Sequence, residues 1–281
     1  MIFASDLDQT LIYSIRSIGL PLDSPLVMPA ETIEGKVRSY ISIQAYEQLK
    51  IIAQEMMFVP VTTRTVEQYR RIELFQERIR PQYAVTSNGG NVLIHGEPDP
   101  EWNARIRRTM LHQAASSEEV QRIYRKVVHG DWVLREDLCD DLFYSILIER
   151  ERMPLEDVMQ LADVLQQLGW ETSIQGRKIY MVPCTVKKSD ALAHIKELAG
   201  VETVIASGDS LLDRCLLDYA THPIAPRHGE LYRVQESNPG TFPYPFTAVS
   251  GALAAEQIVA YAASVQAEAL HSGKLIAKGS I

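Results

Sequence analysis

The sequence IFASDLDQT spans residues 2–10 and joins a short apolar run to a cluster of acidic residues. A buried strand whose carboxyl end meets water has this pattern. Residues 56–61, 83–86 and 203–206 repeat the pattern, because each is an apolar run that stops at polar residues. Pro60 lies inside the second run and argues against a central strand there.

Amphipathic helical patterns lie between these runs, for example at Ala45, Leu49 and Ile52 and again at Leu192 and Ile195. Short apolar strands that alternate with such helices predict an α/β fold with a doubly wound parallel sheet, covered by helices on both faces. Ligands bind beyond the carboxyl ends of the strands in such sheets. We therefore expect the polar residues that follow the four runs to converge.

Residues 91–183 have a different pattern, in which pairs of helices adjoin pairs of strands. Helices are expected at 100–116, 118–128 and 155–168, and strands at 132–138, 142–149, 171–174 and 178–182. This order favours an α+β domain with an antiparallel sheet. The sequence therefore predicts a core formed by residues 1–90 and 184–281, interrupted by an inserted cap at 91–183. The long connection from Ser14 to Ser42 is expected to contain a hairpin that turns near Glu34-Gly35.

Composition narrows the classes of partner. The chain has 281 residues, with 28 Lys and Arg against 36 Asp and Glu, which gives a net charge of −8. This charge argues against a nucleic-acid partner but leaves room for a small basic pocket that binds a phosphorylated metabolite. Three dispersed cysteines favour neither disulfides nor zinc. No membrane span and no secretion signal are evident, so we expect a cytoplasmic protein without a membrane partner.

Asp6 and Asp8 directly follow the first predicted strand, and in a loop at the strand end both carboxylates can reach one ligand. A solvated turn is the structural alternative. An EF-hand loop is excluded, because its sixth position is Leu11 instead of Gly and its twelfth is Ser17 instead of Glu.

A second acidic pair, Asp209 and Asp213, follows the fourth run, where Gly208 allows a tight turn. Two acids four residues apart at the start of a helix suit a hard cation such as Mg²⁺, although an N-cap aspartate beside a surface aspartate has the same spacing. Thr62 follows the second run and is itself compatible with a helix cap. Lys188 lies near a helix N-terminus, where the helix dipole disfavours a cation, so either a functional role or simple solvation accounts for it.

Together these motifs resemble the haloacid-dehalogenase-like phosphohydrolase superfamily, in its Cof-like and sucrose-phosphatase-like branch with a large cap. The resemblance rests on Asp6-x-Asp8-x-Thr10, Thr62, Ser87-Asn88-Gly89-Gly90, Lys188-Ser189-Asp190-Ala191-Leu192 and Gly208-Asp209-x-x-x-Asp213. Three positions depart from the family pattern: Thr63 and Ser189 stand where Gly is common, and Leu212 stands where Asn is common. None of these departures removes a charged group.

The resemblance implies a Rossmann-like core and a metal-dependent phosphatase that acts on a small phosphorylated metabolite, such as a sugar phosphate. It implies Asp6 as nucleophile, Asp8 as acid and base, and Thr62 and Lys188 as groups that hold the phosphoryl oxygens. Mg²⁺ is the implied cofactor, with Asp6, Asp8, Asp209 and Asp213 as its ligands or their support.

Candidate substrate contacts are Thr10, Thr63, Arg64, Asn88, Arg177 and Lys178. Arg177 and Lys178 precede the last predicted strand of the cap, where solvated turn charges are the structural alternative. Two other functions stay open, namely a phosphosugar mutase of the same superfamily and a catalytically silent phosphate-binding module. The sequence does not give the oligomeric state.

Overall fold

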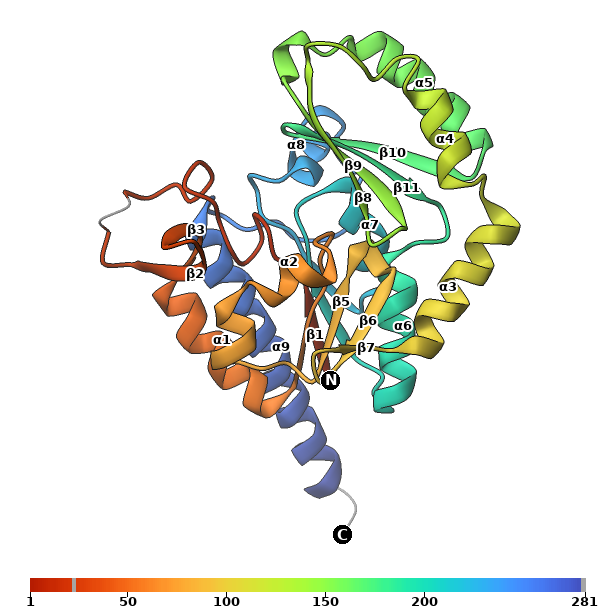
Figure 1. Cartoon of the computed structure of the whole chain (residues 1–281). Coiled ribbons are helices and arrows are strands. Elements are labelled where there is room, and N and C mark those ends of the chain that lie inside the picture. Colours follow the sequence, from red (N-terminus) through yellow and green to blue (C-terminus); the bar gives the residue numbers. More distant parts are fainter. Residues whose placement is uncertain (22–23, 279–281) are drawn as a thin grey trace.

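The computed structural model describes residues 1–21 and 24–278, and Figure 1 shows how they are arranged. The predicted connection from Ser14 to Ser42 is therefore described except at residues 22 and 23. Within the described residues, no helix has the length and apolar character that crossing a membrane requires.

A parallel sheet forms the centre of the molecule, as predicted. Its strand order is β13–β12–β1–β4, and β1 pairs in parallel with both of its neighbours. The strands are β1 (Ile2–Ser5), β4 (Met57–Pro60), β12 (Val204–Ser207) and β13 (His222–Ile224). Three of the four apolar runs thus lie side by side, and their carboxyl ends lie at the same edge of the sheet.

The fourth run, β5 (Tyr83–Thr86), lies next to β4. The two are joined by a parallel bridge between Val61 and Val85, and the Thr62 amide donates to the Val85 carbonyl at 2.8 Å. Strand β5 also pairs in an antiparallel way with β6 (Asn91–Ile94), which pairs with β7 (Glu97–Pro98). Pairing thus continues from β4 across residues 83–98.

Pro60 is the last residue of β4, although we expected it to weaken a strand there. The amides of Met57 and Val61 donate to β1, at the carbonyls of Met1 and Ser5. Because N–H groups alternate in direction along a strand, the position of Pro60 faces away from β1. Pairing with β5 begins only one residue later, so no hydrogen bond of the sheet is lost at Pro60.

Helices cover both faces of the parallel sheet (Figure 1). Phe3 points into one core with α1 (Ile43–Glu55) and α9 (Ala252–Lys278). Its neighbours Ile2 and Ala4 point into the other core, with α6 (Lys188–Ala199) and α7 (Arg214–Tyr219). Shorter helical segments connect the layers: α2 (Val66–Arg70), η1 (Leu74–Arg78), η2 (Ser87–Gly89), η4 (Leu211–Asp213) and α8 (Glu230–Ser237).

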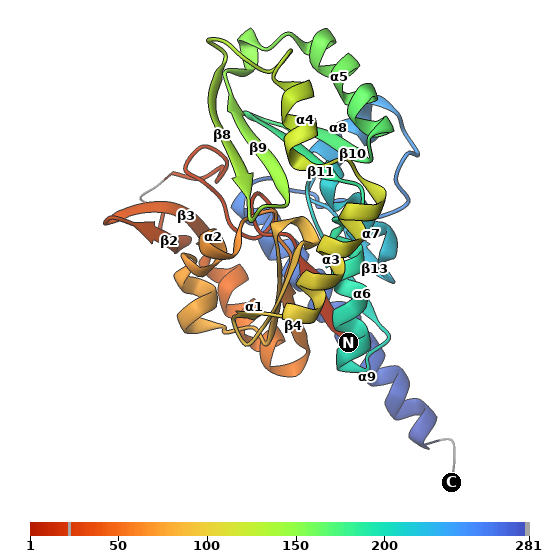
Figure 2. The same cartoon turned by 45° about the vertical axis from the view of Figure 1, so that its right-hand side comes forward.

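A separate antiparallel sheet lies above the carboxyl edge of the parallel sheet (Figure 2), in the order β10–β11–β9–β8. Its strands are β8 (Val133–Cys139), β9 (Phe143–Ile148), β10 (Trp170–Gln175) and β11 (Lys178–Pro183). Its own apolar core includes Trp170, Val120 of α4 and Leu161 of α5. The remaining elements of this region are α3 (Pro100–Gln113), α4 (Ser117–Tyr124), η3 (Arg150–Arg152) and α5 (Leu155–Gln167). The predicted helices and strands of this segment are confirmed, with small shifts at their ends.

The predicted hairpin is formed by β2 (Val27–Ile33) and β3 (Lys36–Ser42). Glu34 and Gly35 at its turn both have positive φ values, 51° and 72°. A two-residue hairpin loop in which both residues have positive φ gives the chain a twist that matches the right-handed twist of the flanking strands. The hairpin lies beside the core, at the flank that carries α1 (Figure 1).

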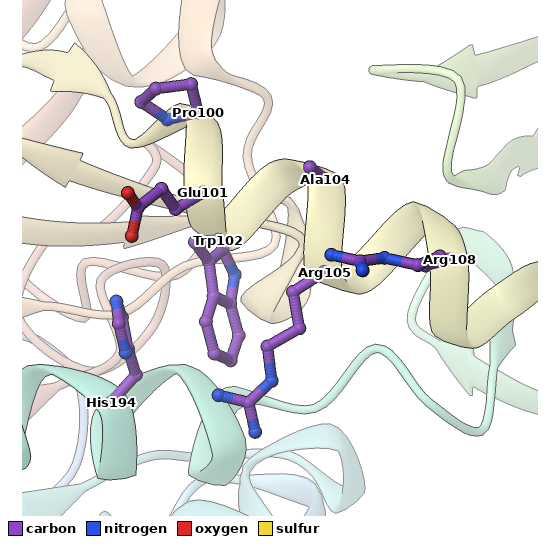
Figure 3. Close-up of a pocket in the computed structure, with 7 residues that line it drawn as sticks. All are labelled: Pro100, Glu101, Trp102, Ala104, Arg105, Arg108 and His194. Atoms are coloured by element: carbon purple, nitrogen blue, oxygen red, sulfur yellow. The ribbon is translucent and has the colours of Figure 1, made fainter.

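Helix α3 leads from the parallel sheet toward the antiparallel one and packs on α6 (Figure 3). The Trp102 and His194 rings stack with their centroids 4.9 Å apart, and Arg105 lies 5.3 Å from the Trp102 ring. Asp99 caps α3 by accepting from the Glu101 amide at 2.9 Å, and it lies 3.1 Å from His194 Nε2. The Asp99 carboxylate therefore caps the N-terminus of α3 and also contacts His194 of α6.

We expect Asp99→Ala to lower the free energy of unfolding by about 1–2 kcal/mol at pH 7, because the helix loses its cap. Asp99→Asn keeps a capping oxygen and loses only the charge, so it should cost less. Burial raises the pKa of Asp99, but the His194 contact and the backbone amides lower it below its ordinary 3.8. The difference between wild type and Asp99→Asn should therefore be complete at neutral pH and shrink as the pH falls below 3.8. Urea unfolding at pH 7 and pH 3 measures this difference, and a value independent of pH would contradict a role for the charge.

Candidate active site

The end of β1 carries the first two candidate residues. The Asp6 amide donates to the Ser207 carbonyl at 2.9 Å, which continues the pairing of β1 with β12 by one residue. Thr10 is fully buried, and its hydroxyl donates to Asp6 Oδ2 at 3.1 Å. Gln9 adopts a positive φ of 64°, which turns the chain so that Thr10 returns to Asp6. The loop therefore fixes the Asp6 carboxylate instead of leaving it in a solvated turn.

Lys188 is the centre of the buried charges. Its ammonium lies 2.7 Å from Asp6 Oδ1 and 2.5 Å from Asp213 Oδ1, with only 1% of the side chain exposed. Burial lowers the pKa of Lys188, but Asp213 and Asp6 outweigh that effect and raise it above its ordinary value. The side chain therefore stays protonated. The cation near the start of α6 is thus paired with two carboxylates and is not solvated.

Asp6, Asp209 and Asp213 form a buried acidic cluster. Each offers a carboxylate oxygen, and these atoms all lie within 4.8 Å of one another. Ser210 donates its hydroxyl and its amide to Asp213 Oδ2, at 2.7 and 3.0 Å. The Asp209 carboxylate has no hydrogen bond or ion pair with any residue that the structure describes, and it borders the cavity described below.

The electrostatics of this cluster fit a divalent cation. Burial raises the pKa of Asp6 to about 7, Lys188 opposes the shift, and Asp213 adds to it. Burial also raises the pKa of Asp209 well above its ordinary value, and the neighbouring Asp6 and Asp213 add to that shift. One lysine thus does not offset the charge of three carboxylates. Hard oxygen ligands grouped in this way suit a metal such as Mg²⁺.

Asp8 makes a different contact, with Arg64. The guanidinium Nε lies 2.7 Å from Asp8 Oδ2 and Nη2 lies 2.8 Å from Oδ1, so the pairing uses both oxygens. Arg64 Nη1 also donates to Oε2 of Glu31, at 2.8 Å. Burial raises the pKa of Asp8, but the two-point contact with Arg64 outweighs burial and lowers it below its ordinary value. In this arrangement Asp8 is a carboxylate.

Glu31 is a residue that sequence reasoning missed. It lies on β2, and its side chain is only 6% exposed. Nothing in the local sequence marks it, because a glutamate in a hairpin strand is normally solvated. Its place beside Arg64 becomes evident only from the way the hairpin packs on the core.

A cavity of about 680 Å³ opens above these residues, between the parallel sheet, the hairpin and the antiparallel sheet. Eight of the candidate residues border it: Asp6, Asp8, Thr63, Arg64, Arg177, Lys178, Lys188 and Asp209. The other four candidates, Thr10, Thr62, Asn88 and Asp213, are buried beside it and do not border it. Residues from four strand ends and from both sheets thus meet at one place.

Thr62 and Asn88 are buried next to the cavity and hold the neighbouring segments in place through hydrogen bonds. Thr62 is fully buried, and its hydroxyl accepts from the Arg64 amide at 3.1 Å. Asn88 Nδ2 donates to the Val186 carbonyl at 3.1 Å, which holds the segment just before Lys188. Gly89 lies against Lys187 and accepts from Trp102 Nε1 at 2.9 Å. The Ser87–Gly90 turn therefore helps to fix where α6 begins.

The parallel sheet carries aspartates, a threonine and a lysine at its carboxyl edge, and an antiparallel sheet with its own helices lies above that edge. This arrangement defines a phosphomonoester hydrolase of the haloacid-dehalogenase type. A family model described as sucrose-6F-phosphate phosphohydrolase matches residues 1–225. The chain belongs to this family.

Solved structures share the fold at low sequence identity. The sucrose-phosphatase of Synechocystis sp. PCC6803, in complex with sucrose and phosphate, aligns with a TM-score of 0.64 at 12% identity, over 93% of this chain and 97% of that one. A Thermoplasma acidophilum protein aligns with a TM-score of 0.58 at 14% identity, over 92% and 95%. The phosphatase BT1666 of Bacteroides thetaiotaomicron aligns with a TM-score of 0.52 at 16% identity, over 93% and 92%. No curated protein sequence matches the chain.

We expect Glu31→Gln to lower the free energy of unfolding by about 1–2 kcal/mol, because a nearly buried bond between charged groups becomes a neutral one. Glu34→Gln is the matched control, since Glu34 is an exposed residue of the same hairpin. Urea unfolding measures both variants. Equal values for the two would show that the Arg64 contact contributes nothing to stability.

A second prediction concerns Gly89, whose φ is +103° and whose place leaves no room for a Cβ beside the Lys187 carbonyl. Gly89→Ala should lower the free energy of unfolding by about 1–3 kcal/mol more than Gly96→Ala. Gly96 has a similar φ of +84°, but an added Cβ meets nothing within 4 Å. Urea unfolding compares the variants, and equal losses would mean that backbone strain alone, and not the contact with Lys187, sets the cost.

Proposed function

We propose that the protein is a Mg²⁺-dependent phosphatase that hydrolyses a small phosphorylated sugar through an aspartyl-phosphate on Asp6. The observation that carries the proposal is the buried pairing of Lys188 with Asp6 and Asp213, beside the unpaired carboxylate of Asp209. Membership of the sucrose-6F-phosphate phosphohydrolase family supports a phosphate ester of a sugar, and the Synechocystis relative was solved with sucrose and phosphate.

In the first half of the proposed reaction, an Asp6 carboxylate oxygen forms a bond to phosphorus, and the bond from phosphorus to the sugar oxygen breaks. Asp8 gives its proton to that sugar oxygen. In the second half, water attacks phosphorus and the bond to Asp6 breaks. Asp8, now a carboxylate, takes the proton from the water, so inorganic phosphate leaves and both residues return to their starting states.

The contact with Arg64 bears on these two roles of Asp8. Because Arg64 holds Asp8 as a carboxylate, the contact suits the second half, where Asp8 accepts a proton. The first half needs protonated Asp8, so we propose that Arg64 loosens its hold when substrate binds. The guanidinium is then available to a phosphoryl or leaving-group oxygen.

The other charged groups balance the phosphate. We propose that Lys188 neutralises charge on the phosphoryl oxygens and that Thr62 supports the loop that receives them. A bound Mg²⁺ would be held by Asp6, Asp209 and the backbone carbonyl of Asp8, with Asp213 in support, and it would offset the repulsion between an anionic nucleophile and an anionic phosphate. Lys188 also orients Asp6, since its ammonium fixes Oδ1 and leaves Oδ2 to the Thr10 hydroxyl.

We propose that the segment 91–183 acts as a cap over a core of residues 1–90 and 184–281. Its four-stranded sheet borders the cavity with one face. The turn between β8 and β9 reaches the core through Asp140, which accepts from the Val66 amide at 3.0 Å and from the Ser87 hydroxyl. Such a contact closes the site, and closure excludes bulk water from the reaction.

Phosphate release tests the proposal. Wild-type protein is given sucrose 6-phosphate, glucose 6-phosphate and p-nitrophenyl phosphate, with Mg²⁺ or with EDTA. We expect release that needs Mg²⁺ and no bisphosphate activator, which separates a phosphatase from a mutase. Asp6→Asn should reduce kcat by roughly a thousandfold or more with the fold intact, because the nucleophile is lost.

The control is Asp163→Asn, which removes an exposed carboxylate from α5 and should leave kcat unchanged. Near wild-type turnover by Asp6→Asn would exclude Asp6 as the nucleophile. Full activity in EDTA would exclude the metal requirement.

A further inference from the structure

The charge of the cavity differs from that of the whole chain. Eight cationic and five anionic residues border the cavity, so its lining has a surplus of three positive charges. The chain as a whole has a net charge of −8. A cleft lined by charge of one sign concentrates ligands of the opposite sign. The cavity is therefore built for an anion, although the rest of the protein is acidic.

Half of these cations already have carboxylate partners within the protein. Arg64 contacts Asp8 and Glu31, and Lys188 contacts Asp6 and Asp213. Arg71 and Arg135 pair with acidic neighbours of their own, Glu67 and Asp137. In the proposed reaction, Lys188 and the metal meet the phosphate that is removed. These groups therefore do not account for the surplus.

The other four cations are Arg16, Arg38, Arg177 and Lys178. None of them forms an ion pair with another residue in the ranges 1–21 and 24–278. They come from two sides of the cavity. Arg16 lies in the loop after β1 and Arg38 on strand β3 of the hairpin, whereas Arg177 and Lys178 lie at the turn between β10 and β11. Exposed cations from three separate elements thus border the same space.

The register of the antiparallel sheet shows what lies next to Lys178. Lys178 is paired with Leu147 on β9 and with Gln175 on β10, and Leu147 is paired with Arg135 on β8. All four of these residues border the cavity. Because neighbouring strands are about 4.8 Å apart, they form one row across the sheet, with a cation at Arg135 and another at Lys178.

A second row lies two residues along the same face and is polar but not cationic. It runs through Asp137, Ser145 and Tyr180, which are paired in that order and also border the cavity. Hydroxyl and carboxylate groups in such a row suit the hydroxyl groups of a sugar. Cations and sugar-binding groups thus lie on one face of the cap.

Lys178 also lies within electrostatic reach of the reacting residues. Burial raises the pKa of Asp8, but Arg64, and to a smaller extent Lys178, lower it below its ordinary value. The row that carries Lys178 borders the same cavity as Asp6, Asp8 and Asp209. A sugar whose phosphate lies at Asp6 would extend from there toward this row.

We propose that the physiological substrate carries a second anionic group, a carboxylate or a second phosphate, on the sugar that leaves, and that Arg38, Arg177 and Lys178 bind it. The inference rests on the proposed phosphatase function and specifies its substrate class. Guanidinium groups pair with both oxygens of a carboxylate or a phosphate, and such charge-assisted bonds are about twice as strong as neutral ones. An uncharged leaving sugar would give these three cations no anionic partner, and Lys178 would keep only its contact with the Tyr180 ring, whose centroid lies 5.6 Å away.

Two matched pairs of substrates test the proposal. Glucose 6-phosphate and 6-phosphogluconate differ at C1, where the second compound has a carboxylate and an open chain, and fructose 6-phosphate and fructose 1,6-bisphosphate differ by one phosphate. For wild-type protein we expect kcat/KM to be about tenfold or more higher for the member with the second anionic group in at least one pair. The pair that shows the difference tells a carboxylate from a second phosphate. The preference should weaken as salt is raised.

Substitutions then locate the subsite. Arg177→Gln combined with Lys178→Gln, and separately Arg38→Gln, should remove most of this preference by raising KM more for the substrate with the second anionic group than for its monophosphate partner. Arg108→Gln is the control, because Arg108 is an exposed arginine of α3 that does not border this cavity. Circular dichroism and thermal unfolding verify that each variant is folded.

Equal kcat/KM for both members of both pairs would overturn the proposal, and the phosphatase function would stand if release still needs Asp6. Calorimetric binding of the same four compounds to Asp6→Asn protein gives a readout without turnover. Tighter binding of a compound with the second anionic group, lost in the Arg177 and Lys178 variant, would support the subsite even if the proposed chemistry failed. Equal binding throughout would refute it.

Discussion

The ammonium of Lys188 is the contact on which the site depends. It joins Asp6 at the end of β1 to Asp213 after β12, and it comes from the first turn of α6. Three segments far apart in the sequence are thus held by one cation, and a buried charge is tolerated only when such partners surround it. The Ser87–Gly90 turn also helps to position Lys188, because Asn88 and Gly89 contact the residues just before it.

The ion pairs of Lys188 also determine how the other acidic groups of the site are balanced. Lys188 balances part of the negative charge of Asp6 and Asp213, but Asp209 adds a third buried carboxylate with no partner among the described residues. Leaving such charge uncompensated is costly at low dielectric, and raised pKa values are the sign of that cost. Asp8 lies outside this balance because it has its own cation in Arg64. Two aspartates two residues apart therefore have pKa values shifted in opposite directions, upward for Asp6 and downward for Asp8.

The sequence predicts the fold well because its signals are local. Apolar runs that stop at polar residues specify buried parallel strands, and the positive-φ turn at Glu34-Gly35 is what a hairpin requires. The strand-end residues therefore converge as the topology demands. The contact of Glu31 with Arg64 depends instead on how the hairpin packs against the core, which no local pattern encodes. The tolerance of Pro60 likewise depends on which way its missing N–H would point, and only the strand register reveals that direction.

The difference between what the sequence gives locally and what only packing produces also applies to charge. The net charge of −8 describes the surface as a whole and argues correctly for an acidic protein, but it is silent about the cavity. Arg38 and Lys178 are 140 positions apart in the sequence, and only the placement of the hairpin and the antiparallel sheet brings them to one space. Field strength at a site depends on nearby charges, because exposed charges more than about 8–10 Å away are screened by salt. The proposed selection of a substrate accordingly depends on a few cations of the antiparallel sheet and the hairpin that border this cavity, and not on the net charge of the chain.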